Sequence, residues 1–269
     1  MRFSVLGSGS AGNATLVACG EQGLLIDCGL SVRQIERRLA LIDFPPRALT
    51  AIVLTHEHDD HLAGAAALSR KYRIPILTTA GTQRAAAARL STAYGIDNLV
   101  ADHTINFGPF TLAAVLVPHD AREPCQFVIG DGEWRLGILT DVGQITPHLL
   151  REFAGLDALV LEFNHDVRLL ANSLYPPSLR ARIAGPHGHL SNLQASALLE
   201  QLDLSRLHTL VAAHLSEKTN HPALVAACLR ARVPAHACWH IAQQHEPLPW
   251  CEMVAPNGQG ATGSIYPSS

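Results

Sequence analysis

The chain has 269 residues, of which 48% are hydrophobic and 16% are charged, and its formal net charge is −3. This composition excludes a wholly disordered chain, because it provides enough apolar material for a large buried core. It also gives no overall basic charge, so nucleic-acid binding would need a local basic patch or bound metal ions. We expect one α/β domain over residues 1–255 and a flexible, Gly/Ser-rich tail over 256–269.

The six cysteines are scattered and form no CxxC pair. They are typical of small buried apolar side chains rather than of a thiolate zinc site. The N-terminus has no secretory pattern, since glycine and serine interrupt its apolar run at residues 7–10. No segment reaches the ~18 consecutive apolar residues that span a membrane. We therefore expect a soluble, cytoplasmic protein with reduced thiols and no membrane partner; a homodimer is left open.

The N-terminal half alternates short apolar segments with turn residues. These segments predict strands over 2–6, 15–18, 24–26, 51–54 and 74–77. Alanine- and leucine-rich stretches between them predict helices over 31–40 (with Ser31 as the cap), 62–72 and 82–94.

A second series of strands follows, predicted over 99–101, 110–117, 125–129, 134–139 and 156–161. Residues 166–190 contain several prolines and are expected to be irregular. The rest predicts a helix with a capping box over 191–202, a strand over 207–213 and a helix over 222–230. Strands thus occur in two groups, each followed by helices, which predicts two sheets with helices on their outer faces.

The segment Thr55-His56-Glu57-His58-Asp59-Asp60-His61 follows a short buried strand and precedes a helix. His56 and His58 are two residues apart on an extended loop, so both imidazoles can face one metal ion. Asp60 and His61 lie where the chain turns into the helix and can face a second ion. Imidazole and carboxylate ligands suit zinc, with manganese or iron as alternatives. Three histidines and two aspartates within six residues fit a structural role poorly.

This HxHxDH segment resembles the metallo-β-lactamase superfamily, whose fold is an αββα sandwich of two mixed β-sheets flanked by helices. Four further segments match the family in order, and they contain Asp27, His119, Asp141 and His214. The resemblance implies two divalent metal ions. One would be held by His56, His58 and His119, the other by Asp60, His61 and His214, with Asp141 between them. It also implies that Asp27 orients the histidine loop. The histidine at position 58 favours the hydrolases over the redox, di-iron branch.

Two segments indicate a branch of the family: Gly188-His189-Leu190-Ser191-Asn192 and Leu161-Glu162-Phe163-Asn164-His165. They resemble the nuclease branches, such as the tRNA 3′-end endonucleases, in which a histidine acts on the scissile phosphate and a glutamate steadies it. The resemblance assigns these roles to His189 and Glu162, which we predict to be catalytic together with Asp60. A histidine at a helix start without a catalytic task is the alternative for His189. The full set of motifs is most similar to the bacterial WalJ/YycJ group, regarded as DNA exonucleases.

Substrate contacts are predicted from the segment between these motifs. The segment contains three arginines, Arg168, Arg180 and Arg182, and only one acidic residue, Asp166, so it is the best local basic patch. A solvated loop would give the same charges. Ser191 and Asn192 are further candidates, although Ser191 also fits a helix cap.

We therefore predict a dinuclear-metal hydrolase that acts on phosphodiesters, most simply nucleic acid, as a DNA exonuclease-like enzyme. A hydroxide between the metals would attack phosphorus, and His189 would act on the leaving group. The alternatives are a small-molecule cyclic phosphodiesterase and a thioester or lactone hydrolase, because the same ligands serve all three. A non-catalytic binding module is disfavoured by the complete ligand set.

Overall fold

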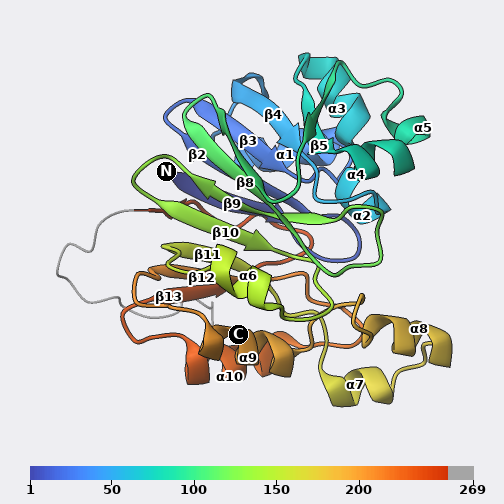
Figure 1. Ribbon diagram of the computed structural model, residues 1–269, viewed down its shortest axis with the longest axis vertical. Coiled ribbons are helices and arrows are strands. Elements are labelled where there is room, and N and C mark those ends of the chain that lie inside the picture. The colour runs from blue at the N-terminus through green and yellow to red at the C-terminus, as the bar shows by residue number, and fades with distance from the viewer. Residues whose placement is uncertain (254–269) are drawn as a thin grey trace.

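A computed structural model of the protein describes residues 1–253, so the predicted tail over 256–269 lies outside the described residues. Two seven-stranded β-sheets lie face to face, and helices cover their outer faces (Figure 1). This arrangement confirms the αββα sandwich that the order of strands and helices predicts. Each sheet is mixed: one part is antiparallel and the other is parallel.

The first sheet contains the N-terminal strands and one strand from the end of the described chain. Its strands β1 to β3 are antiparallel and β3 to β6 are parallel. In spatial order the strands are β14 (Cys251–Glu252), β1 (Arg2–Gly7), β2 (Ala14–Cys19), β3 (Gln22–Ile26), β4 (Leu49–Val53), β5 (Ile76–Thr79) and β6 (Ile96–Leu99).

The second sheet repeats this pattern with the C-terminal strands. Strands β7 to β10 are antiparallel, and β10 to β13 are parallel. In spatial order the strands are β13 (Cys238–Ile241), β12 (Thr209–Ala213), β11 (Ala158–Glu162), β10 (Arg135–Leu139), β9 (Cys125–Gly130), β8 (Phe110–Leu116) and β7 (His103–Phe107).

The helices divide between the two sheets. Those that follow strands of the first sheet are α1 (Val32–Leu41), α2 (Asp59–Leu62), α3 (Ala65–Tyr72), α4 (Ala80–Ala85) and α5 (Ala87–Leu90), with a 3-10 turn at Pro46–Ala48. Those that follow strands of the second sheet are α6 (Pro147–Glu152), α7 (Val167–Ala171), α8 (Pro177–Ile183), α9 (Asn192–Gln201) and α10 (Pro222–Arg232). Within residues 1–253, every helix is too short or too polar to span a bilayer.

Three apolar clusters stabilise the layers. The inner faces of the two sheets bury one cluster, which includes Phe3, Phe110 and Phe127. The outer face of the first sheet packs on α1 and α3, with Ile35 and Leu68 fully buried. The outer face of the second sheet packs on α6, α9 and α10 in the same way. Burial of apolar surface on both faces explains why the central strands are almost continuously hydrophobic.

Several sequence predictions were wrong in detail. The helix predicted over 62–72 is interrupted at Gly64, and the helix predicted over 82–94 is two short helices, α4 and α5. Residues 166–190 are not wholly irregular, because they contain α7 and α8. The strand predicted over 99–101 lies earlier, at β6, and α6, β7, β13 and β14 were not predicted. Tertiary contacts explain the break at Gly64, because its N–H donates to the Cys28 carbonyl oxygen instead of to Asp60 one turn earlier, and an added Cβ would lie 2.0 Å from the Leu30 carbonyl oxygen.

A second close approach joins the Asp27 loop to the start of α2. Gly29 passes so near this turn that a Cβ atom would lie 1.8 Å from the Asp60 carbonyl oxygen. That oxygen accepts a hydrogen bond of 2.7 Å from the Asn13 backbone N–H. The chain crossing at Gly29 therefore positions the turn that contains the candidate metal-binding residues.

We predict that Gly29→Ala lowers the free energy of unfolding by about 1–3 kcal/mol, because the new methyl group must displace backbone. A thermal unfolding scan should show a decrease of several degrees in Tm. Gly95→Ala is the matched control, since its Cβ would meet no heavy atom within 4 Å. Equal Tm values for the two variants would contradict the importance of this crossing.

Candidate metal centre

The predicted site residues meet at one edge of the sandwich, where strands from both sheets end. The segment Thr55–His61 follows β4, and His119 follows β8. From the second sheet, Asp141 follows β10, Glu162 is the last residue of β11, and His214 follows β12. Parallel strands place their carboxyl ends at one edge, so residues far apart in sequence become neighbours there.

Three imidazoles form the first donor cluster. His56 Nε2 lies 2.9 Å from His58 Nδ1, and His119 Nε2 lies 3.3 Å from the same atom. Nitrogen ligands about 2.0–2.1 Å from a tetrahedral zinc ion are roughly 3.3 Å apart. The spacing therefore fits one shared metal ion, and the sequence predicted this set of three residues.

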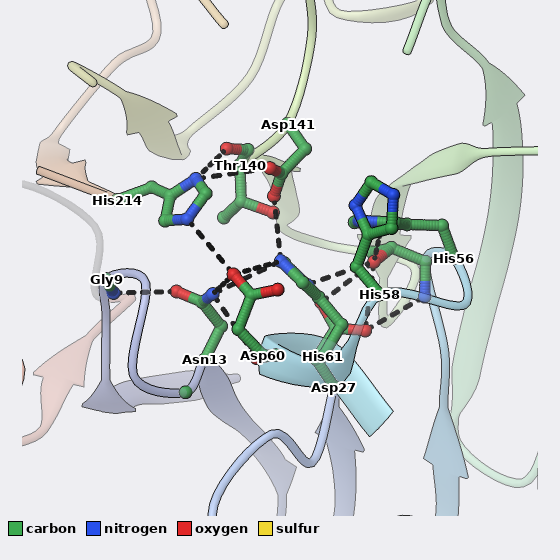
Figure 2. A network of polar contacts seen from close by, with 12 residues as sticks. Gly9, Asn13, Asp27, His56, His58, Asp60, His61, Thr140, Asp141 and His214 are labelled. Carbon is green, nitrogen blue, oxygen red and sulfur yellow. Dashed lines mark hydrogen bonds and ion pairs between the residues drawn. The ribbon is translucent and has the colours of Figure 1, made fainter. Parts of the chain in front are cut away.

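The second donor cluster contains Asp60, His61 and His214. Asp60 Oδ2 lies 3.4 Å from both His61 Nε2 and His214 Nε2. Figure 2 shows these three side chains pointing toward one another. Asp141 lies between the clusters: its Oδ2 is 3.1 Å from His61 Nε2, and its Oδ1 is 3.8 Å from His119 Nε2. This arrangement fits two ions with Asp141 shared between them.

Hydrogen bonds orient four of the histidines so that lone pairs face the centre. The Nδ1–H of His61 donates to Asp27 Oδ2 over 2.7 Å, and those of His119 and His214 donate to the carbonyl oxygens of Gly188 and Thr140. His56 Nδ1 lies 2.9 Å from the Thr55 hydroxyl oxygen, which can accept in the same way. In the neutral tautomer each Nε2 then carries a lone pair, as in metal-binding histidines.

A buried carboxylate oxygen gives an independent indication of a cation. Asp141 is 1% exposed, and its Oδ2 accepts no well-directed hydrogen bond among the described residues, although His61 Nε2 lies 3.1 Å away. A buried carboxylate oxygen without a partner costs several kcal/mol unless positive charge lies nearby. A metal ion between Asp141 and the histidine Nε2 atoms would meet this requirement, so the residues present fit the metal ions that the sequence predicts.

The electrostatics of the cluster point the same way. Burial alone would lower the pKa of His61, but Asp141, Asp27 and Asp60 outweigh it and raise that pKa well above its ordinary value. Burial alone would also lower the pKa of His214, but Asp141 outweighs it and raises that pKa well above its ordinary value. The carboxylates thus create a negative potential that stabilises positive charge, whether as protons or as divalent cations.

Asp27 and Thr55 fix the histidine loop, residues 55–61, through hydrogen bonds. Asp27 adopts a left-handed backbone conformation with φ 60°, which is uncommon outside glycine. Its Oδ1 accepts hydrogen bonds from the Thr55 N–H and hydroxyl, while its Oδ2 binds His61. One carboxylate therefore fixes both the start and the end of the loop. The structure gives Asp27 the geometry of an orienting residue.

Sequence reasoning gave no role to three polar residues that fix the second cluster. The Ser8 hydroxyl accepts from the His214 N–H over 2.6 Å, and the Asn164 amide donates to the His214 carbonyl oxygen. The Asn13 amide donates to Asp60 Oδ2 (Figure 2). These contacts hold His214 in a left-handed conformation with φ 54°. Ser8 and Asn13 lie in the Gly/Ser-rich segment 7–13, whose composition was the available signal.

His189 and Glu162 form a pair beside these clusters. Glu162 is fully buried, and its Oε1 accepts from His189 Nδ1 over 2.7 Å. Its Oε2 accepts from the backbone N–H groups of Leu190 and Val142. Burial alone would lower the pKa of His189, but Glu162 and then Asp141 raise it. Glu162 therefore fixes the His189 ring, which lines the cavity together with Asp60, Asp141 and His214.

The five predicted substrate contacts occupy different places. Arg182 lines the cavity, and its Nε donates to Asp120, a residue that sequence reasoning missed. Arg168 is exposed on α7 outside the cavity lining, and the Arg180 Nη1 donates to the Ala171 carbonyl oxygen. Ser191 caps α9, and Asn192 is buried against Asn220. Of the five, only Arg182 lies where a substrate in this cavity would touch it.

Comparison with known proteins identifies the class. The β-lactamase superfamily domain model matches residues 23–214, and the chain belongs to this family. The exodeoxyribonuclease YycJ of Bacillus anthracis is 31% identical over 228 residues, covering 82% of this chain and 84% of that protein. The exodeoxyribonuclease WalJ of Streptococcus pneumoniae is 32% identical over 226 residues, covering 81% and 83%. The metallo-β-lactamase fold protein YhfI from Bacillus subtilis has a TM-score of 0.71 at 17% identity, covering 92% of this chain and 98% of that one.

We predict that Asp27→Ala lowers metal affinity about 10- to 100-fold, because the His61 ring loses the carboxylate that orients it. The matched control is Asp43→Ala, since Asp43 shares the left-handed backbone (φ 53°) but is exposed on the surface. Competition titration with a zinc chelator measures the affinity, and circular dichroism checks that both variants fold. Equal affinities for the folded variants would remove Asp27 from the positioning role.

Proposed function

We propose that the protein is a metal-dependent phosphodiesterase that acts on nucleic acid as a DNA exonuclease-like enzyme. The observation that carries this proposal is His189, which lines the same cavity as His58, Asp60 and His214 and is fixed there by the buried Glu162. Donor clusters alone would serve any hydrolase of the family. A histidine fixed beside them supplies a group for the leaving oxygen of a phosphodiester.

Two divalent ions are the proposed cofactors, with zinc favoured by the nitrogen-rich ligands and manganese or iron as alternatives. His56, His58 and His119 would hold one ion, and Asp60, His61 and His214 the other, with Asp141 between them. When bound, such ions lower the pKa of water and offset the charge on phosphate oxygens.

The remaining roles belong to side chains. Glu162 accepts from His189 Nδ1 and raises the pKa of the ring, so the protonated imidazole can donate a hydrogen bond or a proton from Nε2 to the leaving oxygen. Asp60 would contribute a carboxylate oxygen to the second ion beside the Nε2 atoms of His61 and His214. Arg182, held by Asp120, places a guanidinium in the cavity that suits a phosphate oxygen.

The relatives support DNA as the substrate class, since both are named exodeoxyribonucleases. The cavity has a volume of about 360 Å³, near the lower end of the ~300–1,000 Å³ that is usual for ligand sites. That size favours a strand end over the middle of a duplex, and it also keeps a small cyclic phosphodiester as the second candidate.

We further propose a cytoplasmic location, which suits six free cysteines. The homodimer stays a prediction.

We predict that His189→Ala lowers kcat/KM for bis-p-nitrophenyl phosphate and end-labelled DNA at least about tenfold, with metal content unchanged. His187→Ala is the control, because His187 is exposed on the same loop. A double variant, His56→Ala with Asp60→Ala, should lose both activities.

Assays with added zinc or manganese measure these rates, and the product ladder separates exonuclease from endonuclease action. Full activity of His189→Ala would overturn its assignment. If the fully metallated wild-type protein cleaves neither phosphodiester, the proposed function is wrong, and thioesters and lactones become the substrates to assay.

A further inference from the structure

The cavity beside the donor clusters has a second, partly apolar wall. Tyr175, Leu179, Arg182 and Ile183 form it, all from one short segment that contains α8. Leu179 and Ile183 are one helical turn apart on α8 and therefore lie on one face, and Tyr175, just before the helix, lines the same cavity. All three are partly exposed. The cavity thus combines metal-binding and catalytic groups with an aromatic and aliphatic surface.

This wall is fixed to the catalytic segment. The His189 backbone N–H donates to the Ile183 carbonyl oxygen over 2.9 Å. A Cβ atom at Gly188 would lie 2.2 Å from the carbonyl oxygens of both Arg182 and Ile183, so glycine permits this contact. The Gly188 carbonyl oxygen in turn accepts from His119 Nδ1. The end of α8, His189 and the first donor cluster therefore form one connected unit.

Lys218 contacts the Tyr175 ring from outside the cavity. Lys218 Nζ lies 5.7 Å from the ring centroid, within the range of a cation–π interaction. Lys218 does not line the cavity, whereas Tyr175 does. One face of the ring is thus covered by the cation, and the ring still borders the space next to His189.

We propose that Tyr175, with Leu179 and Ile183, forms a subsite for the nucleobase of the nucleotide next to the scissile phosphate. The inference deepens the proposed function and rests on it. A phosphate bound beside Asp60, Asp141 and Arg182 brings its nucleoside within reach of this wall, because these three residues and the wall line one cavity of about 360 Å³. Every base has a π face, so stacking on tyrosine binds a strand without selecting its sequence.

Two esters with the same leaving group test the subsite. Thymidine 5′-(p-nitrophenyl phosphate) carries a nucleoside, whereas methyl p-nitrophenyl phosphate carries none. Tyr175→Ala should lower kcat/KM for the thymidine ester about 5- to 100-fold, the range expected for one lost base–aromatic stack. It should leave the methyl ester unchanged. Tyr175→Phe keeps the ring and should restore the thymidine ester.

Tyr94→Ala is the matched control, because Tyr94 is an exposed tyrosine under Arg73 that lies outside this cavity. Titration calorimetry with thymidine 5′-monophosphate and with inorganic phosphate gives a readout that needs no turnover. Tyr175→Ala should lower the affinity for thymidine 5′-monophosphate by about the same 5- to 100-fold factor and leave the affinity for inorganic phosphate unchanged.

The outcomes separate the two proposals. Equal effects of Tyr175→Ala on both esters, or no effect on either, would overturn the subsite while phosphodiesterase activity stands. If the wild-type protein cleaves neither ester, but Tyr175→Ala binds the nucleotide more weakly and inorganic phosphate equally well, the subsite stands and the proposed function fails. Equal binding of the nucleotide by wild type and Tyr175→Ala would overturn the subsite directly.

Discussion

The structure depends on one electrostatic constraint: several lone pairs from buried carboxylates and imidazoles point at the same small volume. His61 Nε2 faces Asp141 Oδ2 at 3.1 Å, and His56 Nε2 faces His58 Nδ1 at 2.9 Å. Such groups repel one another and lose hydration on burial, so the arrangement requires positive charge at its centre. The hydrogen-bond network outside the cluster is arranged to keep these lone pairs in place. This repulsion lowers the stability of the metal-free fold, and bound divalent cations would remove it.

The surrounding fold supplies the rigidity that this constraint needs. Residues on both sheets contribute, so the two halves of the sandwich must keep a fixed separation through their shared apolar core. Asp27 and His214 occupy left-handed backbone conformations, which persist only where neighbouring contacts hold them. Asp27 is held by Thr55 and His61, and His214 by Ser8 and Asn164. Strain at these two positions is a consequence of aiming side chains from two sheets at one point.

The sequence predicted the parts of the site that are local. His56, His58, Asp60 and His61 lie within six residues, and their types alone indicate a metal. The two-sheet architecture was also predictable, because each group of strands is followed by helices. The convergence of His119, Asp141 and His214 could be predicted only from the family resemblance, since spacing along the chain does not report distance across two sheets.

Other features depend on tertiary contacts and could not be predicted. The break at Gly64 arises where its N–H donates to the Cys28 carbonyl oxygen, a contact between segments that are distant in sequence. Arg168 and Arg180 belong to the same basic segment as Arg182, yet only Arg182 lines the cavity: Arg168 lies on α7, and Arg180 lies two residues before Arg182 on α8 and so on another side of that helix. Tyr175 lies in a segment expected to be irregular, and its place beside His189 follows from the packing of α8 on Gly188.

The most direct measurement of the central claim is anomalous X-ray scattering from crystals grown with zinc, with data collected on both sides of the zinc absorption edge. We predict two peaks, one bound by His56, His58 and His119 and the other by Asp60, His61 and His214, with Asp141 contacting both. A single peak, or a peak held by Glu162 and His189 in place of either cluster, would contradict it.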